Sequence, residues 1–157
     1  MPLFPRSTLE MKLEEPAAFN RFTHSLAETA IVTGIAIRLY RALVLSRPDG
    51  GWVYWGVVWS VGTIFFLGML TAHLAHYPKR RWVWRAPVFA TVTVAAEMAV
   101  SLLLIALGRE RWGSVRAEWS DWPGMAANAL LYRGLTVCAW ALVLAGAVWI
   151  VRRYLLR

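Results

Sequence analysis

The chain has 157 residues, of which 59% are hydrophobic and 17% charged, and its net charge is +8 with the histidines neutral. Soluble domains contain about 45–50% apolar residues, and the excess here lies in long blocks, which predicts a single all-α, polytopic membrane domain. The lysines and arginines flank those blocks as topology signals do, so the positive charge does not indicate a nucleic-acid partner.

The N-terminal segment, residues 1–18, is expected to lie in the cytoplasm. It lacks the apolar core of a signal peptide, so the first span must act as its own insertion signal. Ser7 and Glu10 fit a capping box, which predicts a short surface helix that Pro16 ends.

Four apolar stretches are each long enough to cross a bilayer as a helix. The first is the least hydrophobic because it contains Glu28, Arg38 and Arg41, whereas the second has no charged residue. The stretches predict a four-helix transmembrane bundle with spans at about residues 19–46, 52–77, 86–108 and 126–151.

The basic residues predict the orientation of the bundle. An even number of spans places both termini on one side, and most lysines and arginines outside the spans also fall on that side. The positive-inside rule therefore places both termini in the cytoplasm, with the protein in a cytoplasmic (inner) membrane. Ten tryptophans make the chain Trp-rich, and most lie near predicted span ends, as expected for an aromatic belt.

Glu97 lies near the centre of the third span, where a carboxylate costs about 2.5–3.5 kcal/mol on insertion scales and normally has a partner. Thr93 and Ser101 lie one helical turn on either side of it, so the three form a polar stripe. Arg38 and Arg133 fall in the outer parts of the first and fourth spans and are the expected ion-pair partners.

We therefore predict a buried charge network that holds the helices together. Its members are Glu97, Arg38, Arg133, Arg41 and Glu28. The alternative interpretation of the polar stripe is a proton or ion path through the membrane.

The loop between the third and fourth spans predicts an amphipathic surface helix over residues 109–124. Trp112, Val115, Trp119 and Trp122 recur at helical offsets, with charged residues between them. The Pro-Gly pair at residues 123–124 is expected to end this helix.

Three histidines, His24, His73 and His76, fall near the cytoplasmic ends of the first two spans. Histidine at such a depth can bind haem iron, form a hydrogen bond to a quinone, or lie solvated at the interface. Solvation is the expectation for each histidine taken separately.

Residues 21–34 resemble the start of the first helix in four-helix b-type cytochrome subunits. The matching residues are Arg21-Phe22-Thr23-His24 and Thr33-Gly34. These subunits are the membrane anchors of formate dehydrogenases and nickel–iron hydrogenases, and in them the histidine is a haem ligand. The fourth span has no histidine, so the resemblance implies at most one b-type haem, or a quinone, near His24, His73 and His76.

No hydrolase, nucleotide-binding or metal-binding motif occurs, so we expect neither catalytic residues nor a metal site, and at most an electron-transfer role. We expect a non-catalytic membrane subunit that anchors or scaffolds a larger complex. The alternatives are a redox anchor with one haem or quinone, and a small homo-oligomeric channel or transporter. The expected partners are membrane lipids, some of them bound, together with other membrane-protein subunits or further copies of the chain.

Overall fold

The computed structural model describes residues 17–44, 51–113 and 115–154, and within them the all-α prediction is confirmed. The predicted surface helix at Ser7–Pro16 lies outside the described residues. The elements in chain order are α2 (Ala17–His24), α3 (Leu26–Val44), α4 (Trp52–Ala75), α5 (Lys79–Ala106), β1 (Arg111–Trp112), β2 (Val115–Arg116), the 3-10 helix η1 (Trp119–Asp121) and α6 (Trp122–Tyr154).

Three helical segments are long and apolar enough to cross a membrane. They are α4, α5 and the continuous stretch of η1 and α6. The remaining long helix, α3, is not among them, and its 19 residues include Glu28, Arg38 and Arg41.

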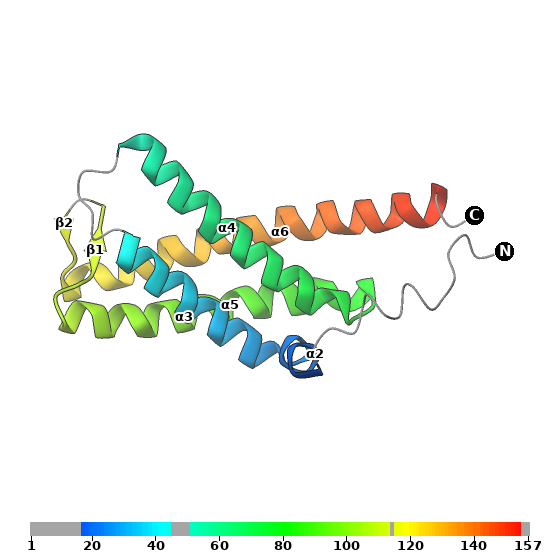
Figure 1. The fold of residues 1–157 in the computed structure, drawn as a ribbon, viewed down its shortest axis with the longest axis horizontal. Coiled ribbons are helices and arrows are strands. Elements are labelled where there is room, and N and C mark those ends of the chain that lie inside the picture. Colours follow the sequence, from blue (N-terminus) through cyan, green and yellow to red (C-terminus); the bar gives the residue numbers. More distant parts are fainter. Residues whose placement is uncertain (1–16, 45–50, 114, 155–157) are drawn as a thin grey trace.

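The four long helices form an elongated bundle (Figure 1). Helix α5 packs against α3 on one side and α6 on the other, and α4 crosses α3. At one end lie the start of α3 and the end of α4 with its histidines, which we call the histidine end. At the other lies the β1–β2 hairpin, which we call the hairpin end. The first turns of α4 lean away from the other helices there (Figure 1), and Trp52 is 85% exposed.

The first predicted span is divided into two helices. The helix breaks at Ser25, and α2 is seen end-on in Figure 1 because it runs across the direction of α3. The Thr29 hydroxyl donates to the Phe22 and Ser25 carbonyl oxygens at 2.6 and 2.7 Å. The bond to Phe22 spans the break and gives a partner to a carbonyl near the end of α2, whereas the Ser25 carbonyl also accepts the Thr29 N–H at 3.1 Å.

The predicted amphipathic helix over residues 109–124 is wrong. The chain forms the β1–β2 hairpin there, and Gly113, with φ of 66°, begins its turn. Pro123 lies in the first turn of α6 instead of ending a helix, since its missing N–H costs nothing at that position. Consequently α6 begins at Trp122 instead of about residue 126.

Gly108 determines where the chain goes after α5. Its φ of 66° allows the Schellman arrangement that ends the helix. The Gly108 N–H donates to the Ile105 carbonyl at 2.9 Å, and the Arg109 N–H donates to the Leu104 carbonyl at 2.8 Å. The turn directs the next residue, Glu110, back over the end of the bundle, where it is 3% exposed.

The apolar core occupies the half of the bundle toward the histidine end. It includes Phe66, Leu70 and Phe89, all fully buried. Helices α3 and α5 approach most closely where Gly34 faces Thr93. A Cβ on Gly34 would collide with the Thr93 carbonyl oxygen and lie 2.8 Å from the Cβ of Ala96, so only glycine fits this crossing.

We predict that Gly34→Ala lowers stability, because overpacking at such a contact costs about 1–3 kcal/mol. The matched control is Gly68→Ala in α4, where a Cβ meets no atom within 4 Å. Thermal unfolding of the two variants in detergent measures the difference. Equal melting temperatures would contradict the close α3–α5 crossing.

Candidate functional site

A buried ion pair joins α5 to α6. The Nε and Nη2 atoms of Arg133 donate to Oε1 of Glu97 at 3.2 and 3.1 Å. Glu97 is fully buried and Arg133 is 5% exposed. The guanidinium carbon also lies 4.7 Å from the centre of the Phe66 ring, so α4 contributes to holding the arginine.

Arg38 makes a second buried ion pair, with Glu110 and not with Glu97. Its Nη2 lies 2.8 Å from Oε2 of Glu110, and the same Nη2 donates to the Ser101 hydroxyl at 2.9 Å. Glu110 was not predicted from the sequence, because a carboxylate in a loop between helices is expected to be exposed to solvent. The signal that could have found it was Gly108, whose position after the helix allows the chain to turn back.

The polar stripe of α5 faces α3. Thr93, Glu97 and Ser101 are all fully buried. Oε2 of Glu97 and the Thr93 hydroxyl oxygen have no hydrogen-bond partner among the described residues. The carboxylate therefore has one satisfied oxygen and one open acceptor, which is unusual for a buried charge.

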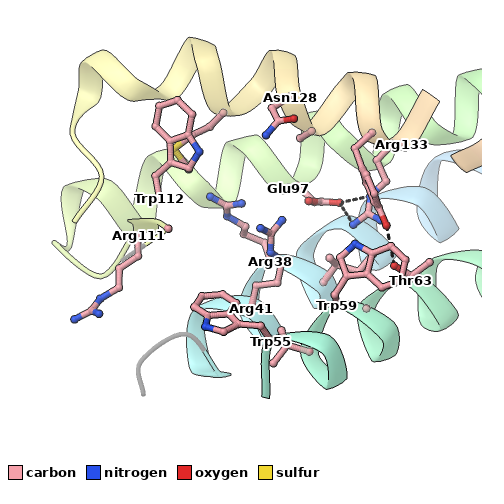
Figure 2. A pocket seen from close by; sticks show the side chains of 17 residues that line it. Arg38, Arg41, Trp55, Trp59, Thr63, Glu97, Arg111, Trp112, Asn128 and Arg133 are labelled. Carbon is pink, nitrogen blue, oxygen red and sulfur yellow. Dashed lines mark hydrogen bonds and ion pairs between the residues drawn. The ribbon is translucent and has the colours of Figure 1, made fainter. Parts of the chain in front are cut away.

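A cavity of about 280 Å³ lies beside this carboxylate, in the half of the bundle toward the hairpin end. Its walls come from α3, α4, α5, β1 and α6, and Figure 2 shows arginines and aromatic rings surrounding it. At its rim Trp55, Trp59 and Trp112 are between 41% and 58% exposed, so the cavity is open to the surroundings. The polar and aromatic lining residues are Arg38, Arg41, Trp55, Trp59, Thr63, Glu97, Arg111, Trp112, Asn128, Tyr132 and Arg133.

The lining is cationic. It contains four arginines and one carboxylate; Glu110 pairs with Arg38 and the guanidinium of Arg111 points away from the cavity in Figure 2, which leaves an excess of one positive charge. Arg41 forms no hydrogen bond or ion pair with another described residue, although Arg38, Arg133 and Glu97 are close enough to act on its charge. Figure 2 shows the two α3 arginines side by side in the cavity, on the side of Glu97 away from Arg133. This arrangement can bind an anion.

Glu28 does not join this group. It is exposed near the start of α3, ten residues before Arg38 and toward the histidine end. Arg41 is likewise exposed, at the cavity, and not buried as the predicted network required. The structure thus brings together four of the five predicted network residues around one cavity and leaves Glu28 out.

Beyond Glu97 and Arg133 the cavity ends against the apolar core. Phe66, Leu70 and Phe89 are fully buried there, and Val137 is 2% exposed. No polar side chain of the cavity lining lies past this layer. The cavity therefore reaches into the bundle from one end only.

The histidine end is a separate polar cluster, in which both ring nitrogens of His73 are engaged. Its Nδ1 donates to the Thr23 carbonyl at 2.8 Å, and its Nε2 accepts from Nε of Arg85 at 3.2 Å. Arg85 in turn lies 3.5 Å from the centre of the Tyr77 ring. These contacts tie α2, α4 and α5 together.

His24 and His76 stack on one another, with ring centres 3.8 Å apart and an angle of 29° between the planes. Nδ1 of His24 lies 2.8 Å from the Asn20 carbonyl, and Nε2 of His76 lies 2.7 Å from the Thr23 hydroxyl. Axial haem ligands point a free ring nitrogen at the iron from opposite faces of the porphyrin. Nε2 of His24 engages no other described residue, but two rings stacked face to face do not lie on opposite faces of one porphyrin, so His24 and His76 do not form such a pair.

Comparisons with models of protein families, with curated proteins and with solved structures found no match for this chain.

We predict that the two charges of the Glu97–Arg133 pair depend on each other. Glu97→Leu alone leaves Arg133 buried without its partner, which costs about 3–5 kcal/mol. The double variant Glu97→Leu, Arg133→Leu recovers most of that loss, since no buried charge is left unpaired. Thermal unfolding of both single variants and the double variant measures the coupling, and additive losses would contradict it.

Proposed function

We propose that the protein is a non-catalytic integral membrane subunit that anchors or scaffolds a larger membrane-protein assembly. In this proposal the bundle has four spans with α3 as the fourth, both termini lie in the cytoplasm, and the hairpin end faces the opposite side of an inner membrane. The observation that carries the proposal is the apolar outer surface of α5 and α6.

That surface is large and continuous along α6. Leu135, Leu142 and Val143 are 59–75% exposed, and further along the helix Ile150 is 51% exposed. A soluble monomer rarely exposes so much apolar area, so the surface supports contact with lipid or with another apolar protein surface.

Small residues lie on the same outer surfaces. Ala95 and Ala99 are four apart on the exposed face of α5, and Gly146 and Ala147 are exposed on α6. Small residues let the backbones of neighbouring membrane helices approach closely. Their exposure supports partner helices against α5 and α6, in addition to lipid.

The side-chain distribution of α3 supports it as a fourth span despite its charges. Arg38 is buried in an ion pair and Arg41 lines the cavity. The face of α3 that points away from the bundle is apolar, with Ile31, Val32, Ile35 and Leu39 each 38–47% exposed. The arginines would therefore not meet lipid tails, which removes most of the cost of inserting them.

Two observations weigh against the alternative functions. The hydrogen bonds of His73 and the stacking of His24 on His76 do not suit a haem held by two of these histidines. The apolar layer at Phe66 and Phe89 ends the cavity inside the bundle, which does not fit a conduction path through one copy of the chain.

The test is site-specific photo-crosslinking in the native membrane. We expect a photoreactive amino acid at Leu142 or Ala99 to give discrete adducts with other membrane proteins, because these positions lie on the proposed partner surface. The control position is Leu70, which is fully buried in the apolar core away from the cavity and should crosslink only within the chain.

Two results would contradict the proposal. Adducts of the chain with itself alone would indicate a homo-oligomer, and lipid adducts alone would indicate an isolated bundle. A haem absorption band in the purified protein would shift support to the redox anchor.

A further inference from the structure

We propose that the cavity at the hairpin end binds the headgroup of an anionic phospholipid that carries a hydroxyl group beside its phosphate, the chemistry of a phosphoglycerol headgroup. Three observations lead to it: Arg41 has no partner and Oε2 of Glu97 has no donor among the described residues, and the cavity opens between tryptophans.

Arg41 supplies the anion contact. A guanidinium carries five N–H donors in a planar fork that matches two phosphate oxygens, and Arg41 gives none of them to another described residue. Arg38 donates to Glu110 and Arg133 donates to Glu97, but both arginines also line the cavity. The excess of positive charge favours a ligand with at least one negative charge.

Glu97 determines which second chemical group the ligand carries. Arg133 satisfies its Oε1, while Oε2 is fully buried and accepts nothing. A phosphate or carboxylate oxygen beside Oε2 would be repelled and would leave it without a donor. A hydroxyl group donates to it, so a ligand with a phosphate at Arg41 and a hydroxyl at Glu97 satisfies both open positions.

The shape of the site favours a lipid over a free phosphate ester. A volume of about 280 Å³ lies just below the usual range of about 300–1,000 Å³ for ligand pockets, so it holds a headgroup and not acyl chains. The rim is formed by the rings of Trp55 and Trp59 on α4, which are 41% and 58% exposed, and these apolar rings suit the start of the acyl chains.

The depth of Arg41 fits the same occupant. It lies one turn before the end of α3 at Val44, which is where a spanning helix reaches the level of lipid phosphates. Tryptophan rings are also enriched at that level.

The experiment compares lipid binding by the full chain, delipidated in detergent, through native mass spectrometry. The probes are phosphatidylglycerol, phosphatidic acid, phosphatidylcholine and free glycerol phosphate. We expect phosphatidylglycerol to bind most tightly, phosphatidic acid more weakly because it lacks the glycerol hydroxyls, and the other two least. Equal binding of the zwitterionic lipid, or of phosphatidic acid, would overturn the assigned headgroup, and tighter binding of free glycerol phosphate would overturn the lipid source.

The variant Arg41→Gln locates the site. It should weaken phosphatidylglycerol binding by about tenfold or more, since a hydrogen-bonded charge is lost. Its melting temperature without lipid should be unchanged, because Arg41 forms no hydrogen bond or ion pair within the part of the chain that the structure describes. The matched control is Arg109→Gln, an exposed arginine in the connection after α5 that does not line the cavity. Equal weakening by both variants, or none by Arg41→Gln, would overturn the proposal.

Discussion

The ion pair between Glu97 and Arg133 is the interaction on which the polar half of this bundle depends. Burying the Glu97 carboxylate of α5 is energetically possible because Arg133 of α6 places a guanidinium nitrogen 3.1 Å from it. The pair fixes the register of α6 against α5, and Phe66 of α4 lies against the same arginine. Three helices thus meet at one pair of charges, and the cavity lies directly beside it.

The second pair, between Arg38 and Glu110, has a different consequence. It holds the connection after α5 down onto α3, beside a second apolar cluster in which Ala117 of the connection packs against α5 and α6. The close crossing at Gly34 brings α3 near enough for Arg38 to reach Ser101 as well. The buried ion pairs therefore lie in the half toward the hairpin end, together with the smaller of two apolar clusters, and the larger apolar cluster lies toward the histidine end.

Sequence pattern alone predicted much of this arrangement and missed specific parts. The hydrophobic blocks of the sequence predicted the positions of the long helices, because a helix needs about 20 mostly apolar residues to cross a bilayer. The depth of Glu97 and Arg133 placed them within reach of each other. The hairpin at residues 111–116 was missed because the helical spacing of its tryptophans resembled an amphipathic helix, while Gly108 and Gly113 determined the backbone. Glu110 was missed because its burial depends on that turn.

The central claim is that the polar cavity opens only toward the hairpin end and ends at the apolar layer within the bundle. Single-cysteine variants in a Cys138→Ser background test it with a membrane-impermeant thiol reagent applied from each side. The account predicts that Asn128→Cys, in the cavity wall, is labelled only from the non-cytoplasmic side, and that Ala90→Cys, in the core, is labelled from neither. Labelling of Ala90→Cys, or of Asn128→Cys from the cytoplasm, would contradict it.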